Sequence, residues 1–489
     1  MAHESRMLID GKLVESETGR RFDNINPATE EVMGNTADGT RADMERAVAA
    51  ARQAFDHTDW SRNPDLRIAG LRQLQAALEA EREDIRAELI AEAGCPLLST
   101  YGPQLDVPLK EALTWPTDMI GQFAWKRSLP DKDAFGIGAP AAREVWKEPI
   151  GVVGVITPWN FPLEIILNKI GPILAMGNTM VLKPAPDTPW NATRIGRIIA
   201  EQTDIPPGVI NIVTSSDHLV GEVLSTSPLV DMVAFTGSTA TGRRIMTAAA
   251  QTIKPTFLEL GGKSVYLILE DDGDISGAVG GSAFISMHAG QGCAMPTRLL
   301  VPHSRYDEAV EIVKVAMERN KYGDPTDPSV LQGPQVSKRQ QERVLGYIQK
   351  GKDEGARLVT GGGVPASTPR GFFVEPTIFA NVDNTMTIAQ EEIFGPVLSV
   401  IGFADDDEAV RIANDSIYGL SGVLFANDLE RAKSVASRIR TGTLGINGGL
   451  WYGADAPFGG YKQSGIGRQC GLEGLEMFTE TKTVGWPAT

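Results

Sequence analysis

The segment HAGQGCAMPTR, residues 288–298, contains a cysteine that could act as a nucleophile. Cys293 lies between the small residues Gly292 and Ala294, which would leave room for a carbonyl substrate beside its sulfur. A glycine-rich start of a helix at this point would also lower the pKa of the thiol, and the thiolate is the reactive form. Because cysteine is among the most buried residue types, a packing role is the alternative for this residue taken alone.

A second motif, TPWNFPLE at residues 157–164, offers a hydrogen-bond donor to such a nucleophile. Addition of a thiolate to a carbonyl creates an oxyanion, which needs donors already aimed at it. The side-chain amide of Asn160 can be one of these donors. An asparagine before Phe161 and Pro162 is equally typical of a turn, so the spacing to other motifs has to decide.

Two further motifs combine turn residues with polar side chains. Glu259 in LELGGKS (258–264) lies between two leucines and before two glycines, where partial burial would raise its pKa toward neutrality and suit it as a general base. A solvated glutamate at a strand end is the alternative. FTGSTATG (235–242) contains Gly237 and Ser238, and such a segment alone indicates only a turn.

Composition restricts the class of protein. The chain of 489 residues is long enough for two large domains, and its 42% hydrophobic residues can fill their cores. A net charge of -16 without a cluster of lysines and arginines disfavours nucleic-acid binding. No signal peptide is evident and no run approaches about 18 apolar residues, so we expect a cytoplasmic protein without a membrane partner. Its 3 cysteines and 5 histidines are dispersed, which argues against a disulfide framework and a metal site.

Helices at both ends of the chain follow from caps and apolar spacing. A capping box from Thr40 to Asp43 predicts one helix. Asn63 before Pro64 predicts a second start, followed by an apolar face that runs to Leu89. Further helices are expected around 306–319 and 337–355.

From residue 151 the chain alternates short β-branched runs with segments long enough for helices. The runs are 151–156, 178–183, 209–213, 230–235 and 265–269, and two more follow at 396–402 and 421–426. This alternation predicts two α/β domains with parallel sheets covered by helices on both faces, divided after Gly261 and Gly262. Such sheets bind ligands beyond the carboxyl ends of their strands.

In order and spacing, the motifs together resemble the aldehyde dehydrogenase superfamily. The resemblance also includes KPAPDTP (183–189), EEIFGPV (391–397) and PFGGYKQSGIGR (457–468), and it spans nearly the whole chain. It implies a non-acylating enzyme that oxidises an aldehyde to a carboxylic acid with a nicotinamide cofactor. The implied fold is α/β, with a Rossmann-like cofactor domain, an α/β catalytic domain and a small β oligomerisation element.

The resemblance gives three residues catalytic roles. Cys293 matches the nucleophile that forms a thiohemiacetal and then a thioester, with Arg298 at the family's spacing. Asn160 matches the oxyanion-hole asparagine, and Glu259 matches the general base for deacylation. Relatives that pass the acyl group to coenzyme A generally lack this acid, so its presence favours a carboxylic acid as product. A cofactor-independent thiol esterase or acyltransferase remains the alternative, since the same cysteine and oxyanion hole suit acyl transfer.

The resemblance assigns six further residues to the cofactor. They would contact its adenosine ribose (Lys183), its face (Trp159), its pyrophosphate at a helix start (Gly237, Ser238), and its nicotinamide ribose and ring (Glu392, Phe394).

Departures from the family pattern bear on the choice of cofactor. Ser215 and Asp217 stand where members often carry two closely spaced glycines. Pro186 stands where many NAD-preferring members carry a glutamate, and loss of that acid removes a repulsion against a 2'-phosphate. NADP therefore stays open, but we expect NAD because no extra basic residue lies beside Lys183.

Positions that match the family's substrate tunnel are mostly aromatic. They are Phe161, Asn168, Trp451, Tyr452 and Phe458. Because this set offers no basic partner for a carboxylate, we expect a neutral, apolar aliphatic or aromatic aldehyde as the substrate.

Three other polar residues fall near the expected site. Lys169 matches a lysine that the family keeps there, and Gln469 replaces the family's usual glutamate. His288 replaces the asparagine usually found five residues before the nucleophile. A thiolate–imidazolium pair with Cys293 is one interpretation of His288, but a structural residue bonded to the main chain is favoured.

The resemblance also divides the chain into three units. Residues 1–127 and 149–260 would form the cofactor domain, 261–463 the catalytic domain, and 128–148 with 464–489 the oligomerisation element. Such an element usually gives a homodimer or homotetramer.

Overall fold

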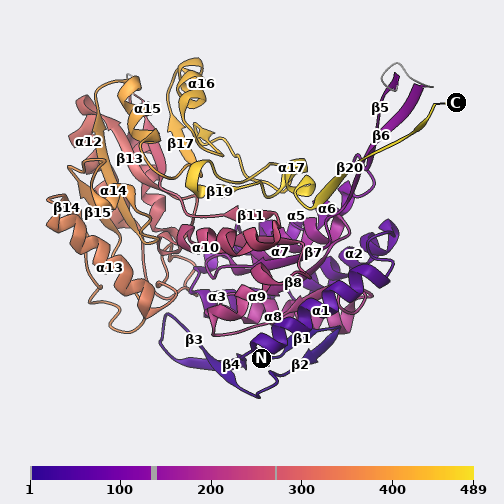
Figure 1. Ribbon diagram of the computed structural model, residues 1–489. Coiled ribbons are helices and arrows are strands. Elements are labelled where there is room, and N and C mark those ends of the chain that lie inside the picture. Colours follow the sequence, from indigo (N-terminus) through magenta and orange to yellow (C-terminus); the bar gives the residue numbers. More distant parts are fainter. Residues whose placement is uncertain (1–2, 134–139, 270–272, 489) are drawn as a thin grey trace.

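Two sheets with parallel centres organise the chain (Figure 1), and the computed structural model describes residues 3–133, 140–269 and 273–488. The first sheet has 8 strands in the order β19 (Gly465–Ile466), β11 (Thr256–Glu259), β10 (Met232–Thr236), β7 (Val152–Ile156), β8 (Thr179–Lys183), β9 (Ile210–Ile212), β1 (Met7–Ile9) and β2 (Lys12–Val14). The five strands from β11 to β9 are mutually parallel. Each outer strand is antiparallel to its inner neighbour: β19 to β11, β1 to β9, and β2 to β1.

Helices cover both faces of this sheet, as the alternating pattern predicts. One face packs against α2 (Pro64–Ala80), α3 (Arg82–Ala93), α7 (Pro162–Ala175) and α8 (Trp190–Gln202). The other packs against α1 (Arg41–His57), α9 (Glu222–Thr226) and α10 (Thr239–Ala249). Successive strand residues alternate between the two cores, for example Val152 and Val153 of β7.

The capping predictions hold, with one correction. The Thr40 box begins α1, and Asn63 caps α2 through a bond from the amide of Leu66. The apolar face expected to run to Leu89 is divided between two helices, because Glu81 leaves helical geometry between α2 and α3. The Glu81 carboxylate binds three side chains of the α8 region, Arg194, Arg197 and Gln202.

The second sheet has 7 strands, in the order β14 (Arg357–Thr360), β15 (Thr377–Ala380), β16 (Val397–Phe403), β13 (Pro296–Pro302), β12 (Ser264–Ile268), β17 (Gly422–Phe425) and β18 (Gly445–Ile446). Only β14 is antiparallel to its neighbour. One face packs against α11 (Ser276–Gly281) and α12 (Tyr306–Arg319), and the other against α13 (Lys338–Asp353), α15 (Asp406–Asn414) and α16 (Leu429–Arg438). The strands β11 and β13 were not predicted, because neither coincides with one of the β-branched runs.

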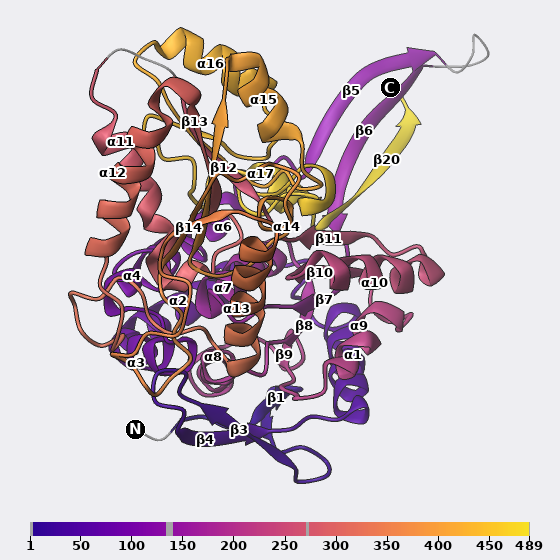
Figure 2. The same cartoon turned by 90° about the vertical axis from the view of Figure 1, so that its left-hand side faces the viewer.

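A third sheet stands apart from these layers (Figures 1 and 2). It consists of β5 (Lys126–Asp133), β6 (Pro140–Pro149) and β20 (Thr479–Pro487), with β6 in the middle. We call this sheet the arm, and most of its side chains are exposed or half-buried. Part of the expected oligomerisation element, residues 134–139, lies outside the described residues.

The remaining elements are short and connect these layers. They are the hairpin β3 (Arg21–Ile25) and β4 (Val32–Ala37), and the helices α4 (Leu97–Thr100), α5 (Asp106–Glu111), α6 (Thr114–Met119), α14 (Thr387–Gln390) and α17 (Gly471–Glu476). Five 3-10 turns complete them: η1 (His218–Gly221), η2 (Ala250–Thr252), η3 (Ser282–Gly290), η4 (His303–Arg305) and η5 (Lys462–Ser464).

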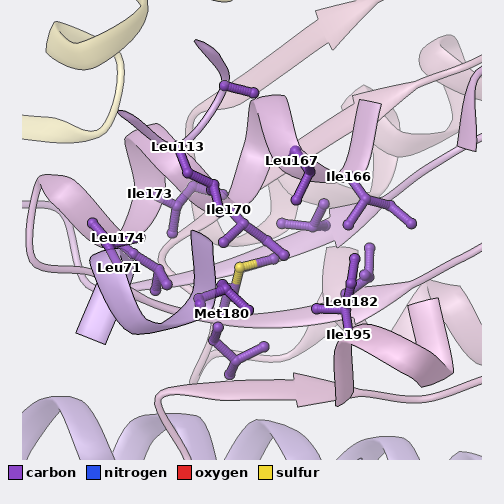
Figure 3. Close-up of a cluster of buried hydrophobic side chains, with 14 of the residues drawn as sticks. Leu71, Leu113, Ile166, Leu167, Ile170, Ile173, Leu174, Met180, Leu182 and Ile195 are labelled. Atoms are coloured by element: carbon purple, nitrogen blue, oxygen red, sulfur yellow. The ribbon is translucent and has the colours of Figure 1, made fainter. Parts of the chain in front are cut away.

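Helix α7 is held firmly by its apolar side. Figure 3 shows Ile166, Ile170 and Leu174 of this helix packed among side chains of α2 and β8, including Leu71 and Met180. All five of these side chains are at most 1% exposed. The helix that follows the TPWNF motif is therefore a rigid support for whatever its opposite side presents.

Candidate active site

The carboxyl ends of four parallel strands meet at one edge of the first sheet. Ile156 at the end of β7 pairs with Lys183 at the end of β8, and Thr236 of β10 pairs with Glu259 of β11. Phe235, next to Thr236, pairs with Ile156, so the four ends are level. This is the edge at which open parallel sheets bind ligands.

Cys293 lies at this edge in a turn, not in a helix. The turn connects η3 to β13, whose first residue is Pro296. The expected helix start is wrong, because the chain enters a strand three residues after the cysteine. The expected lowering of the thiol pKa is wrong as well: burial and the Glu259 carboxyl raise the pKa of Cys293 well above its ordinary value. The thiol therefore needs a base.

Glu259 is a buried carboxyl beside this thiol. Its carboxyl is 3% exposed at the end of β11, and it lies close enough to the thiol of Cys293 for each group to shift the pKa of the other. Burial raises the pKa of Glu259 to about 7, opposed by the ammonium of Lys169. The predicted shift toward neutrality is confirmed, and its cause is desolvation. A carboxyl with a pKa near the ambient pH can both accept and release a proton.

The side chain of Asn160 points toward the loop that carries the cysteine. Its amide Nδ2 donates to the carbonyl of Gln291, two residues before Cys293, at 3.0 Å. Gln291 is fully buried and is itself fixed by a bond from the amide of Val336 at 2.9 Å. An amide nitrogen has two hydrogens, so one holds the orientation of Asn160 and the other is available to an oxyanion.

His288 helps to fix the main chain of Asn160. The carbonyl of Asn160 lies 2.9 Å from His288 Nε2 and accepts from Gln104 Nε2 at 2.9 Å. Burial lowers the pKa of His288 to about 4, so the ring is neutral and donates through Nε2. The favoured interpretation of His288 as a main-chain-bonded residue is confirmed, and a neutral ring cannot be the imidazolium of an ion pair.

The two glycines of LELGGKS have steric reasons. A Cβ on Gly261 would lie 2.4 Å from the carboxylate of Glu392, and one on Gly262 would lie 2.4 Å from the carbonyl of Cys293. Contacts this short do not occur for real side chains, so position 262 must be glycine, whereas a side chain at position 261 would displace the carboxylate of Glu392. The motif brings Glu392 and the cysteine loop against the strand that carries Glu259.

The residues assigned to the cofactor gather at the same strand ends. Ser238 caps α10 by accepting from the amide of Thr241, as expected for a helix start. The Trp159 and Phe394 rings meet edge to face at 5.4 Å. Glu392 accepts from the amide of Gly262 at 2.9 Å, and burial raises its pKa to about 7.

Lys183, which is expected to contact the adenosine ribose, is buried. Its ammonium donates to the carbonyl of Ser215 at 3.2 Å, and burial lowers its pKa to about 8 against the fields of Asp217, Asp187 and Asp38. The segment that replaces the glycine pair is thus tied to the lysine. The charge around it is predominantly negative.

The five residues expected to form the substrate tunnel form two clusters. Trp451 and Phe458 stack at 5.9 Å, and Tyr452 meets both edge to face at 5.9 and 5.7 Å. Asn168 joins this aromatic group to α7 by donating to the Tyr452 hydroxyl at 3.0 Å. Phe161 lies separately against the His288 ring, at 5.5 Å.

Glu164 also lies in this region, although its sequence context did not predict it as a substrate-tunnel residue. Its carboxyl accepts from the hydroxyl of Tyr452 and from Asn168 Nδ2, so it lies among the expected tunnel residues. The available signal is helical spacing, because Glu164 and the expected tunnel residue Asn168 are four residues apart on α7.

Three buried cations and amides around the centre are fully engaged. Lys169 donates to Gln469 Oε1 and lies 4.1 Å above the ring of Phe257. Arg298 binds the carbonyl of Lys263 at 3.0 Å and three acceptors near α15, so it joins strands and does not contact the cysteine. Within residues 3–133, 140–269 and 273–488, no group of three or more His, Cys, Asp or Glu side chains could hold a metal ion.

The profile of the Aldehyde dehydrogenase family matches residues 13–484. The chain is 43% identical over 479 residues to a 3-succinoylsemialdehyde-pyridine dehydrogenase from a Pseudomonas species, covering 97% of each protein. The chain therefore belongs to the aldehyde dehydrogenase family, and the resemblance stated from its motifs is confirmed.

Solved structures agree with this assignment. A variant of betaine aldehyde dehydrogenase from Staphylococcus aureus, in complex with NAD+, superposes with a TM-score of 0.95 at 36% identity, covering 99% of this chain and 98% of that one. An indole-3-acetaldehyde dehydrogenase from P. syringae, with NAD+ and IAA, gives 0.94 at 36% identity, covering 100% and 97%. The predicted α/β fold of the family is confirmed. Among the described residues, no helix is long and apolar enough to cross a membrane.

Proposed function

We propose that this protein oxidises an aldehyde to the carboxylic acid through a cysteine thiohemiacetal and a thioester. One observation carries the proposal: the Cys293 thiol lies beside the buried carboxyl of Glu259, whose pKa is about 7 and which raises the pKa of the thiol. A high-pKa thiol beside a neutral-range base can lose its proton at the moment of attack, with no charge left unpaired beforehand.

The chain's own residues account for each proton in the scheme. Glu259 accepts the thiol proton as the sulfur of Cys293 attacks the carbonyl carbon. The oxyanion accepts hydrogen bonds from the free hydrogen of Asn160 Nδ2 and from the amide of Cys293. After its proton has passed to solvent, Glu259 deprotonates the water that attacks the thioester carbon. The C–S bond then breaks, the sulfur of Cys293 takes up this proton from Glu259, and the carboxylic acid leaves.

Bound NAD+ supplies the acceptor for the two electrons that aldehyde oxidation releases. Residues Trp159, Lys183, Gly237, Ser238, Glu392 and Phe394 would hold it along the strand ends. The buried hydroxyls of Thr157 and Thr236 at these ends have no partner within the described residues, which suits a polar ligand there. We infer a preference for NAD over NADP, because the acids around Lys183 would repel a 2'-phosphate.

We infer an aldehyde with an apolar aliphatic or aromatic body as the substrate class. The stacked rings of Trp451, Tyr452 and Phe458 support this choice. Two similar proteins are named for aldehydes that carry a pyridine or an indole ring.

We also propose the division into units: a cofactor domain (1–127 and 149–260), a catalytic domain (261–463) and an oligomerisation element (128–148 and 464–489). The arm supports self-association into a homodimer or homotetramer, since β5 and β20 are both edge strands of a largely exposed sheet. All three cysteines are free, which suits the reducing cytoplasm.

The test is a panel of aldehydes with NAD+ and NADP+ in parallel, followed at 340 nm, for the wild type and Cys293→Ala. We expect oxidation with NAD+ by the wild type, and none by the variant, which still binds NAD+ in a titration of protein fluorescence. Ester hydrolysis without any cofactor-dependent oxidation would instead identify the alternative, a thiol esterase or acyltransferase. Turnover retained by the variant would refute the cysteine mechanism.

A further inference from the structure

Glu164 is an acid on the side of α7 that faces the substrate residues. The core residues Ile166, Ile170 and Leu174 fix the opposite side of the helix (Figure 3). Glu164 is half-buried, whereas these core residues are fully buried. The position of the carboxyl is therefore determined by the helix and not by the mobility of a loop.

Two hydrogen bonds attach this carboxyl to the aromatic cluster. Oε1 of Glu164 accepts from the Tyr452 hydroxyl and, at 3.0 Å, from Asn168 Nδ2. Asn168 in turn accepts from the thiol of Cys470, 3.7 Å away. Both hydrogen bonds use the same oxygen, Oε1, and among the described residues none is made to Oε2.

A role in starting the helix does not account for these contacts. Glu164 lies in the first turn of α7, where an acid favours the helix dipole. That effect requires only a carboxyl near the first amides, but this one turns toward Tyr452, a residue 288 positions along the chain. Desolvation raises the pKa of Glu164 to about 7, and the hydrogen bonds from Tyr452 and Asn168 and the charge of Lys169 offset it only in part.

We propose that Glu164 makes the enzyme selective for aldehydes that carry a positively charged nitrogen at the end remote from the carbonyl. This inference rests on the proposed aldehyde oxidation and replaces the fully neutral substrate expected from the sequence. Oε2 faces the cationic group, and the apolar body of the aldehyde lies along the rings.

The surroundings of Glu164 favour a cation in two further ways. The faces of Trp451, Tyr452 and Phe458 attract cations through their ring quadrupoles. Two more acids, Glu111 and Asp455, act electrostatically on Cys470, which is bonded to Asn168. Lys169, whose charge acts on Glu164, is fully buried and bonded to Gln469.

The experiment compares isosteric aldehydes that differ only in charge. The pairs are 3-aminopropanal with butanal, and 4-(trimethylammonio)butanal with 5,5-dimethylhexanal, which cover two chain lengths. For each pair the ratio of kcat/KM, cation over neutral, is measured with NAD+ for the wild type and Glu164→Gln. Glutamine keeps an oxygen for Tyr452 and removes only the charge.

We expect the ratio for at least one pair to fall by about tenfold or more in Glu164→Gln, since a charge-assisted contact is lost. The control Asp118→Asn removes an exposed charge from α6, the neighbour of α7, and should leave the ratio unchanged. Turnover of the neutral aldehydes shows that Glu164→Gln is folded. Equal ratios in the wild type and Glu164→Gln for both pairs would overturn the inference, whereas absence of NADH formation with every aldehyde would overturn the proposed function instead.

Discussion

The catalytic centre and the aromatic cluster beside it are held in place by different means. Cys293, Asn160 and Glu259 come from three separate segments, and buried main-chain contacts orient two of them, such as the bond from Asn160 to the carbonyl of Gln291. The aromatic cluster is held together by side chains, through ring contacts and the hydroxyl of Tyr452, and its main-chain support is the pairing of Phe458 with Gln469. In the proposed function, the reaction therefore depends on residues that the main chain positions, and few substitutions can be tolerated there. Selectivity for the aldehyde depends on side chains of the aromatic cluster, which can be substituted one at a time.

The sharpest test of this contrast is Glu259→Gln. Loss of the base should reduce kcat by about 10²- to 10⁴-fold, because the thioester then waits for unassisted water. Because Glu259 also accepts the thiol proton, stopped-flow absorbance at 340 nm should show slower NADH formation in the first turnover as well as slow turnover afterwards.

The pH dependence of the wild type gives the sign of the same effect. The ionised form of Glu259 is the base and its pKa is about 7, so thioester hydrolysis should rise with pH below 7 and level off above it. The variant should lack this rise. A kcat within about threefold of the wild type would remove Glu259 from deacylation.

A smaller effect is expected one layer below the centre, at His288. His288→Ala removes one of two donors to the carbonyl of Asn160, which corresponds to about 1 kcal/mol and a fall in kcat of about fivefold. His288→Asn restores a donor and should recover most of the loss. KM should change little in either variant.

The pH profile separates two roles for His288. Because its pKa is about 4, the ring is neutral throughout the working range and its removal should not move the profile of acylation. A profile that shifts in His288→Ala would mean that the ring titrates during the reaction, contrary to the structure.

The smallest effect is expected in the aromatic cluster. Trp451→Ala removes the stack on Phe458 and should raise KM for an aromatic aldehyde by about two- to tenfold, with kcat nearly constant. Steady-state kinetics with an aromatic and a short aliphatic aldehyde measure it, and only the aromatic one should respond strongly. A fall of kcat comparable to that of Glu259→Gln would erase the distinction between the two regions.

How far the sequence predicts the molecule follows the same division. The sheets were predictable where strands are buried on both faces, as in β7 and β8, since continuous β-branched runs are rare elsewhere. The strand β11 was missed, because its four residues include Thr256 and Glu259 and lack that pattern. The turn at Cys293 was mistaken for a helix start, since glycines precede both.

The candidate site was predictable only where residues stand in motifs. Asn160 and Glu259 stand beside Pro, Gly or aromatic residues that mark them, whereas Glu164 is one acid within an apolar helix. Its significance appears only when Tyr452 is folded against it, and no local pattern encodes a partner so distant in the chain. The same holds for Gln104, which meets Asn160 from another helix-rich segment.

The arm can be completed only at the end of synthesis, because its strand β20 lies near the C-terminus. Its strand β20 pairs with β6 along nine residues, from Thr479 with Pro149 to Pro487 with Ala141, although more than 300 positions separate them. At about 5–20 residues per second of synthesis, β6 has to wait on the order of 20–70 s for its second neighbour. During that interval the edge of β6 that later pairs with β20 has no partner strand. This edge is therefore a site at which a chaperone or a second copy of the chain could bind during synthesis.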